Sequence, residues 1–225
     1  MLYCNMRDRF SFAILFQTLL LSSNAHAIPD STVRIGKGKY YTYIDQYAGP
    51  YYFPMSILTD TSFHTGHDTF MNAWFSKHLY AMNEPILSTQ QNTEEVFRFT
   101  WLRTFHHPVI VRLVKTADKY LLYWKSSTGA GGYKPGVLYI DKFRELDQKT
   151  WNSFTVKYNA VNFKAMNTNE ASFGTDGAMW IFEAGKGANY HMVYRHGPRE
   201  ELAYRECCLY LLSLTDMKIR RREIY

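Results

Sequence analysis

Histidines and acidic side chains are the residues of this sequence with the clearest capacity for chemistry. One group, His64, His67 and Asp68, lies in the run His-Thr-Gly-His-Asp. Two imidazoles and a carboxylate at this spacing can ligate one metal ion, and zinc sites commonly use such groups. With 8 histidines in the chain, the spacing also arises easily by chance. We therefore expect surface histidines and no metal site, and keep these three residues as candidate ligands.

His106 and His107 form a second group, which falls between two predicted strands. Either imidazole is a candidate general base, with Asp176 or Glu183 as an orienting carboxylate and Ser126 or Ser127 as a nucleophile. Nothing in the spacing selects these residues. The sequence also lacks the Gly-x-Ser-x-Gly, Ser-x-x-Lys and His-Glu-x-x-His motifs of common hydrolases. An enzyme is therefore the less favoured interpretation, and we expect no cofactor.

Three charged residues interrupt apolar strand patterns. Arg103 shares a strand face with Trp101, Arg112 lies between two aliphatic residues of the next strand, and Glu183 lies in a later strand. Because an unpaired buried guanidinium costs several kcal/mol, we predict that Glu183 pairs with Arg103 or Arg112. The alternative is a polar cleft in which a free arginine binds an anionic ligand. Trp101, Arg103 and Arg112 are therefore the candidate ligand-binding residues.

The segment GAGGYKPG at residues 129–136 is rich in glycine. A phosphate-binding loop needs the order Gly-x4-Gly-Lys-Ser/Thr between a strand and a helix. This segment instead lies between two predicted strands. It is predicted to be a hairpin connection, and a mobile loop beside a binding cleft is the alternative.

Hydrophobic periodicity predicts the elements that must position these residues. A helix is expected over 68–82, with Asp68 as its N-cap and Asn83-Glu84-Pro85 ending it. Strands are expected at 96–105, 109–115, 120–126, 137–141, 178–184 and 190–195, and further helices at 147–160 and 199–214. The first of these strands alternates between an apolar face and a polar face that includes Arg98, which predicts a half-buried strand. This order predicts an α+β fold: an antiparallel sheet of about six strands, made of a four-strand meander and a hairpin, with helices packed mainly on one face.

Residues 1–27 have the features of a cleaved secretory signal peptide. A basic start precedes an apolar run from Phe10 to Leu21, and an Ala-x-Ala stop follows at 25–27. The run is shorter than the ~20 residues that span a bilayer. We expect an exported protein, periplasmic or secreted, without a transmembrane segment after cleavage. Residues 28–225 are expected to form a single globular domain, in which 28–65 is irregular and wraps the rest.

The charge balance is mildly basic, with 26 Lys and Arg against 20 Asp and Glu and a formal net charge of +6. Part of the excess lies at Lys218 and at the three arginines of 220–222. Such a cluster can bind anionic lipid, cell wall or nucleic acid. A solvated terminal segment is the commoner explanation, and export argues against nucleic acid.

After signal cleavage the remaining cysteines are the neighbours Cys207 and Cys208. A bridge between adjacent residues cannot hold distant segments together, and its geometry is incompatible with the helix predicted there. We interpret them as small helical residues, one of them buried. Aromatic residues make up 17% of the chain, so an aromatic core must stabilise the fold.

Five blocks are distinctive in order and spacing over residues 71–215: MNAWFSKHLYAMNEP, VFRFTWLRTFHHPV, GGYKPG, DGAMWIFEAG and CLYLLSLT. They resemble a family of uncharacterised exported bacterial proteins with no assigned function. The resemblance implies export, and it brings no activity, cofactor or catalytic residues.

These observations favour an exported, cofactor-free binding or interaction module of the bacterial cell envelope. Its partner is expected to be an envelope protein or a small ligand, bound around Trp101, Arg103 and residues 129–136. One alternative is a periplasmic hydrolase with a His/carboxylate site at His106, His107 and Glu183, and another is an envelope immunity or inhibitor protein. A hydrolase requires histidine and carboxylate to converge in a pocket, whereas a binding module presents an exposed apolar patch or groove.

Overall fold

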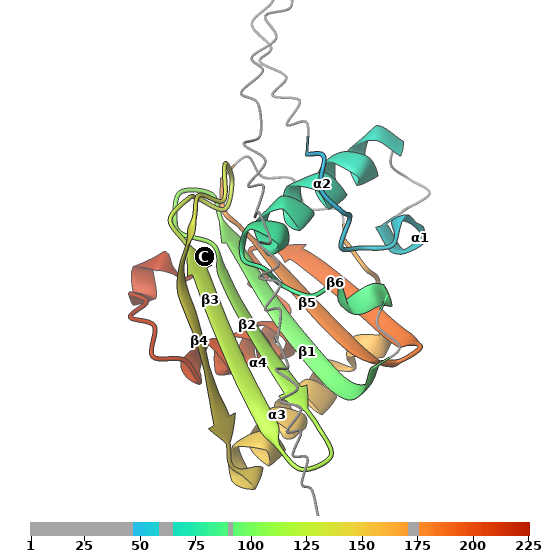
Figure 1. Cartoon of the computed structure of the whole chain (residues 1–225), viewed down its shortest axis with the longest axis vertical. Coiled ribbons are helices and arrows are strands. Elements are labelled where there is room, and N and C mark those ends of the chain that lie inside the picture. The colour runs from blue at the N-terminus through green and yellow to red at the C-terminus, as the bar shows by residue number, and fades with distance from the viewer. Residues whose placement is uncertain (1–46, 59–64, 90–91, 171–175) are drawn as a thin grey trace, which may run out of the picture. The chain divides into compact units, whose positions relative to one another are not determined.

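A six-stranded antiparallel sheet with the strand order β4-β3-β2-β1-β5-β6 forms the centre of the fold (Figure 1). Its strands are β1 (Asn92–Arg103), β2 (Val109–Lys115), β3 (Tyr120–Ser127), β4 (Leu138–Leu146), β5 (Ala178–Gly187) and β6 (Asn189–His196). The first four strands make a meander, and β5 and β6 make a hairpin whose β5 pairs with β1. The predicted α+β fold with a meander and a hairpin is confirmed.

The structure is a computed structural model that describes residues 47–58, 65–89, 92–170 and 176–225. The side chains of 65–68 and 92–93 are not described. All described residues belong to one compact unit, Ile44–Tyr225. The predicted signal peptide and residues 28–46 of the predicted wrapping segment lie outside the described residues.

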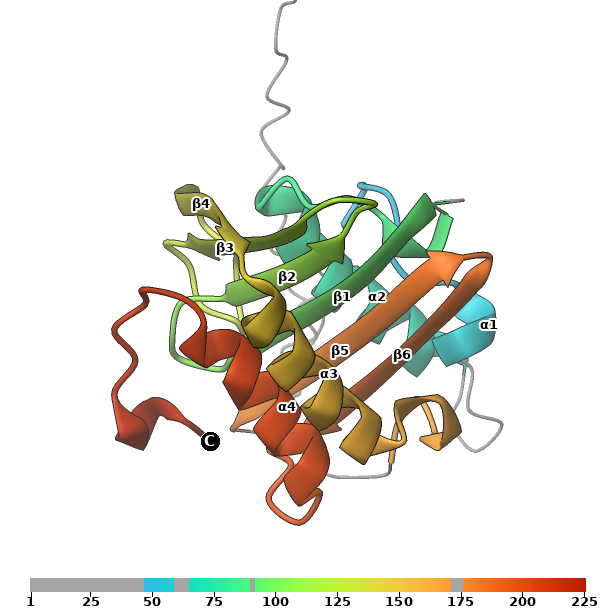
Figure 2. The same ribbon diagram turned by 90° about the horizontal axis from the view of Figure 1, so that it is seen from below.

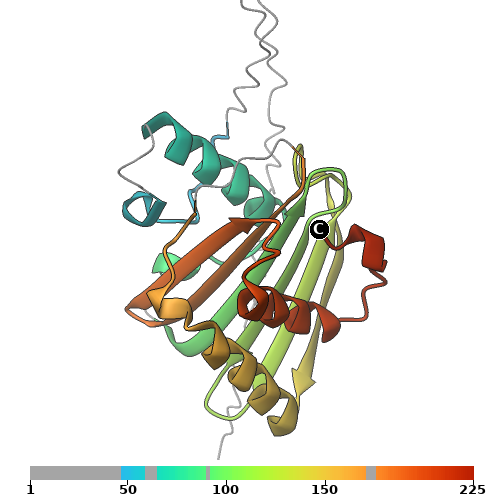
Figure 3. The ribbon, with the colours of Figure 1, turned by 180° about the vertical axis from the view of Figure 1, so that it is seen from behind.

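Helices lie on both faces of the sheet (Figure 2). The helices α3 (Gln148–Val161) and α4 (Leu202–Ser213) pack side by side on one face (Figure 3). The helix α2 (Thr65–Ala81) and the single turn α1 (Met55–Leu58) lie on the other. Three short 3-10 turns complete the described elements: η1 (Leu87–Thr89), η2 (Phe163–Ala165) and η3 (Arg221–Glu223). We call the two faces of the sheet the α2 face and the α3/α4 face.

Two layers of core result from the alternation of side chains along the strands. Phe97, Phe99 and Trp101 of β1 belong to the core of the α3/α4 face, with Trp151, Phe154 and both cysteines among their companions. The α2 face has its own core, in which Leu102, Ile110, Ile181 and Met192 of the sheet lie with Phe75 and Leu79 of α2. Arg98 and Thr100 on the α2 face of β1 are fully buried as well. The sequence-based prediction of a half-buried strand here was therefore wrong, because β1 is central in the sheet and covered on both faces.

Element boundaries differ from expectation at three places. Helix α2 begins at Thr65, so Asp68 lies within the helix and is not its N-cap. Strand β4 continues to Leu146, well past the predicted end at Asp141, because its exposed side chains give little apolar alternation. The segment predicted as irregular includes the turn α1, and its Tyr52, Phe53 and Leu58 are buried in the core of the α2 face.

The start of α3 is where the sequence predicts it. Asp147 precedes the helix in an extended conformation, and its Oδ1 accepts a hydrogen bond of 2.7 Å from the backbone N–H of Thr150. This satisfies one of the N–H groups that a helix start leaves unpaired. At the other end, Asn162 takes the left-handed conformation with φ 53° and ends the helix.

Candidate functional site

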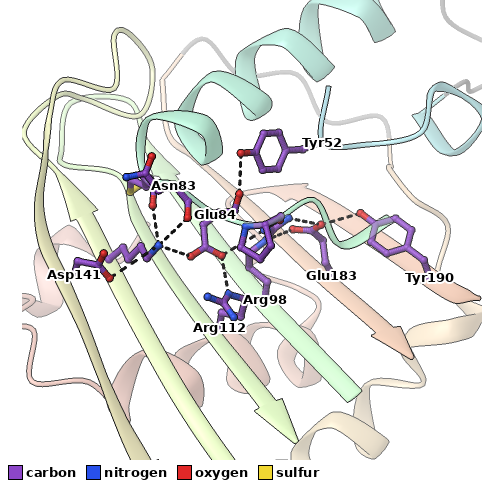
Figure 4. A network of polar contacts seen from close by, with 11 residues as sticks. Tyr52, Asn83, Glu84, Arg98, Arg112, Asp141, Glu183 and Tyr190 are labelled. Atoms are coloured by element: carbon purple, nitrogen blue, oxygen red, sulfur yellow. Dashed lines mark hydrogen bonds and ion pairs between the residues drawn. The ribbon is translucent and has the colours of Figure 1, made fainter. Parts of the chain in front are cut away.

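The largest group of charges that are buried or nearly so lies on the α2 face, below the end of α2 (Figure 4). It consists of Glu84 from the chain just after α2 and of Arg98, Arg112, Lys125 and Glu183 from four neighbouring strands. We call these five residues the Glu84 network. Isolated charges are strongly disfavoured inside a protein, so the partners of each group determine what the network can do.

Arg98 and Glu183 form the inner end of the network, and both side chains are fully buried. They lie directly opposite each other on β1 and β5. Arg98 donates from Nε to Glu183 Oε2 at 2.6 Å and from Nη2 to Oε1 at 2.7 Å. The hydroxyl of Tyr190 donates to Oε1 at 2.8 Å. Burial alone would lower the pKa of Arg98, but Glu183 outweighs burial and raises it. This bidentate pair therefore has a structural role inside the protein.

Glu84 lies between three cations. Arg98 and Arg112 face each other across β1 and β2, an arrangement that like charges disfavour. Glu84 Oε2 accepts from Arg112 Nε at 2.9 Å and from Arg98 Nη1 at 3.4 Å, and Oε1 lies 3.2 Å from Lys125 Nζ. Burial would raise the pKa of Glu84, but Arg112, Arg98 and Lys125 together lower it below its usual value. The carboxylate therefore stays ionised and holds the two arginines together.

Lys125 joins the network to the end of α2. Its Nζ donates to the carbonyl oxygens of Met82 at 2.9 Å and Asn83 at 3.0 Å. Asn83 takes the left-handed conformation, with φ 50°, just after the helix. A cation at the carbonyl end of a helix satisfies unpaired acceptors and complements the helix dipole. The network thus fastens α2 to the sheet, which is a structural role.

Arg112 is where the network reaches the surface. Its guanidinium carbon lies 4.3 Å from the ring centre of Tyr123, and the Tyr123 ring stacks on Phe143 with ring centres 5.9 Å apart. These three residues lie opposite one another on β2, β3 and β4. Phe143 is 69% exposed, and the side chain of Arg112 is 14% exposed. We call them the Arg112–Phe143 row. It lies on the half of the α2 face that α2 leaves uncovered (Figure 1).

The predicted partner of Glu183 was wrong. Arg103 points to the α3/α4 face, so it cannot reach Glu183, and the Nε of Arg112 is bonded to Glu84. Arg98 lies opposite Glu183 in the sheet and forms the ion pair with it.

The predicted binding surface around Trp101 and Arg103 needs correction as well. Trp101 is 0% exposed and Arg103 4%, because both lie under the C-terminal segment on the α3/α4 face. Arg103 lies over the Trp101 ring and contacts Glu223 at 3.3 Å. Of the three candidate ligand-binding residues, Arg112 alone keeps partial access to solvent.

The candidate catalytic residues are not brought together. His106 and His107 lie in the β1–β2 connection, where His106 hydrogen-bonds the Tyr225 hydroxyl at 2.8 Å and His107 the Gly129 carbonyl at 2.8 Å. Glu183 faces Arg98, in the middle of the sheet. Ser126 donates to the Pro108 carbonyl at 2.8 Å. The described residues therefore assemble no base–carboxylate pair from this set.

The side chains of the candidate metal ligands lie outside the part of the chain that the structure describes. His64 lies outside the described residues, and His67 and Asp68 lie in the part of α2 whose side chains are not described. Elsewhere in the described chain, no cluster of three or more His, Cys, Asp or Glu side chains is placed to hold a metal ion.

Sequence reasoning missed Glu84, Arg98 and Lys125. Glu84 lies between Asn83 and Pro85 and was interpreted only as part of a helix stop. Arg98 was assigned to a polar strand face. The burial of Arg98 could have been recognised, because its neighbours in the strand are mostly apolar and aromatic residues.

Comparison of the chain with models of known protein families and with curated proteins finds no match. The resemblance to uncharacterised exported proteins therefore stays a prediction. Across the described ranges, no helix combines the length and the apolar character needed to cross a bilayer.

Proposed function

We propose that this chain is an exported, cofactor-free binding module of the bacterial cell envelope, and that the Arg112–Phe143 row is its ligand site. The observation that carries this proposal is the state of Arg112. Its Nε is bonded to Glu84, whereas its two terminal nitrogens have no hydrogen-bond partner among the described residues. A guanidinium held in place by a buried carboxylate, with free donors and partial access to solvent, is preorganised to bind an anion.

The charge balance supports an anionic ligand. Three cations of the Glu84 network face two buried carboxylates, and the next acidic side chain, Asp141, is half exposed at 4.0 Å from Lys125. A bound anion beside Arg112 would offset the remaining positive charge. The stacked rings of Tyr123 and Phe143 add an apolar surface next to it. The ligand class is therefore an organic anion, a carboxylate or phosphate that carries a flat apolar group.

Titration with benzoate, octanoate and acetate, followed by two-dimensional NMR of the labelled protein, tests the site. Benzoate is expected to shift the backbone signals around Tyr123 and Phe143, and acetate to bind more weakly because it has no apolar group. Phe143→Ala should weaken benzoate binding by about three- to tenfold. Val156→Ala is the matched control, because Val156 is 70% exposed on α3. Absence of shifts with all three anions would overturn the proposal, as would an unchanged Kd for Phe143→Ala.

Export is tested separately. In a bacterial host the full chain is expected in the periplasm or medium, with a new N-terminus at Ile28 as read by mass spectrometry. Replacing Leu19 and Leu20 by arginine interrupts the apolar run and should leave uncleaved protein in the cytoplasm. If the unaltered chain stays cytoplasmic with its first residues intact, the envelope assignment is wrong.

A further inference from the structure

Two neighbouring connections close one end of the sheet as a single unit. The β3–β4 connection, which contains the glycine-rich segment, lies against the β1–β2 connection: Gly131 N–H donates to the His106 carbonyl at 3.0 Å, and Gly132 N–H to the Thr104 carbonyl at 3.3 Å. The Trp74 indole of α2 donates to the Gly131 carbonyl at 2.7 Å. A Cβ at Gly131 would lie 2.5 Å from the backbone of β1. The glycine therefore permits a close approach that fixes both connections.

This unit and the adjoining start of β4 expose four large apolar side chains to solvent. Phe105 is 61% exposed, Tyr133 58%, Val137 69% and Tyr139 52%. The rings of Phe105 and Tyr133 lie 6.3 Å apart between their centres. We call these four residues the loop-end surface. Burying such side chains in water-free surroundings is strongly favourable, so their joint exposure on a fixed backbone indicates an interaction surface.

The C-terminal segment brings basic residues to the same end of the sheet. Glu223 contacts Arg103 at 3.3 Å, the Tyr225 hydroxyl bonds His106, and the Tyr225 carbonyl oxygen accepts from the Trp180 indole at 2.9 Å. Figures 1 and 3 both show the C-terminus beside the two connections. The basic residues just before this anchor are exposed: Lys218, Arg220, Arg221 and Arg222. We call these four the basic segment. No acidic side chain of the described residues lies within ion-pair distance of them.

We propose that the loop-end surface and the basic segment together dock this protein on an anionic lipid bilayer. Aromatic side chains with a polar end are favoured at the level of the lipid headgroups. Clustered Lys and Arg are attracted to acidic headgroups. Apolar insertion and charge attraction are each weak alone, and two such signals together give stable peripheral binding. The charge complementarity favours lipid over a neutral partner such as a glycan. This inference does not depend on the ligand site at Arg112.

Co-sedimentation with vesicles tests the docking. The full chain is expected to bind vesicles of equal parts phosphatidylglycerol and phosphatidylethanolamine. It should bind phosphatidylcholine vesicles far more weakly, and its affinity for the anionic vesicles should fall as the salt concentration rises. Replacing Arg220, Arg221 and Arg222 by glutamine should weaken the partition coefficient on the order of 100-fold. The double variant Phe105→Ser/Tyr133→Ser should weaken it on the order of tenfold or more.

Matched controls change the same residue types at other places. Lys149, Lys164 and Lys186 are exposed basic residues away from this end of the sheet, and their triple replacement by glutamine should leave most of the binding. Phe143→Ser/Val156→Ser removes exposed apolar side chains elsewhere and should have little effect. Equal binding to neutral vesicles overturns the proposal. So does an unchanged affinity of the Phe105/Tyr133 variant, or binding to insoluble peptidoglycan in place of vesicles.

Discussion

His78 is a fully buried histidine of α2, and the described residues offer neither of its ring nitrogens a well-aligned hydrogen bond. Burial, with a smaller contribution from Lys77, lowers its pKa from 6.5 to about 3. The folded protein therefore keeps His78 neutral, while the unfolded chain takes up a proton below pH 6.5. The free energy of unfolding should fall by about 1.4 kcal/mol for each pH unit between 6.5 and 3 from this group alone.

Replacing His78 by leucine removes this pH dependence. Urea unfolding of His78→Leu, measured from pH 7 to pH 4, should give a smaller loss of stability than the unaltered protein shows. His191 is a suitable control, because it is only partly buried and hydrogen-bonds the Met166 carbonyl. Equal slopes for the His78→Leu variant and the unaltered protein would show that His78 does not titrate as its burial requires.

Glu84 differs from His78 in that its charged form is the stable one in the folded protein, because cationic partners surround it. Glu84→Gln leaves Arg98 and Arg112 facing each other without a buried carboxylate between them, and should cost about 3–5 kcal/mol at pH 7. Because the folded pKa of Glu84 is lowered, its stabilisation is complete above its unfolded pKa of about 4.3 and is lost as pH falls below that value. The variant should therefore lose less stability than the unaltered protein below about pH 4.3.

Glu145→Gln serves as the comparison for Glu84→Gln. Glu145 pairs with Lys119 at 3.0 Å, but both side chains are more than half exposed. Such a pair contributes between 0 and about 1 kcal/mol. The free energy of unfolding of both variants is measured in denaturant. A similar loss for the two substitutions would show that Glu84 does not hold the network together.

At the scale of elements, Lys125 is the contact that determines how firmly α2 is held. Lys125→Met keeps much of the side-chain length but removes the donors to Met82 and Asn83. Hydrogen exchange should then become faster along α2, since opening of that helix no longer breaks these bonds. Exchange in α3 and α4, on the opposite face, should stay unchanged. Uniformly faster exchange over the whole chain would show instead that α2 opens only on global unfolding.

The elements themselves were largely readable from sequence, because short connections after β1 and β2 require antiparallel neighbours. The side-chain partners were not. Glu183 could be recognised as a buried charge, but its partner depends on which strand lies next to β5, and nothing local specifies that β5 pairs with β1. Glu84 lies in an irregular segment, where a glutamate is normally solvated. The network is therefore a property of the tertiary arrangement.

For the molecule as a whole, stability must come from packing, since Cys207 and Cys208 are free thiols. Both are buried, whereas the sequence suggested one. Burial raises the pKa of Cys207 to about 12, and Lys157 offsets this only in part. We expect iodoacetamide at pH 8 to leave both thiols unmodified in the folded protein and to modify both after unfolding in urea, as measured by mass spectrometry. Rapid alkylation of the folded protein would show that α4 opens readily.

A thermal scan complements the alkylation result. The Tm should be the same with and without dithiothreitol, since no described disulfide contributes to the fold. A lower Tm under reducing conditions would contradict this expectation.

The order in which the sheet is completed has a consequence for synthesis of the chain. The central strand β1 gains its second neighbour from β5, and the indole of Trp180 in β5 finds its acceptor only at Tyr225. A ribosome releases residues in sequence, so β1 stays without this second neighbour until β5 has been translated. Such a nascent chain cannot close its core early. That delay fits the export proposed above, in which the chain would cross a narrow channel while still unfolded.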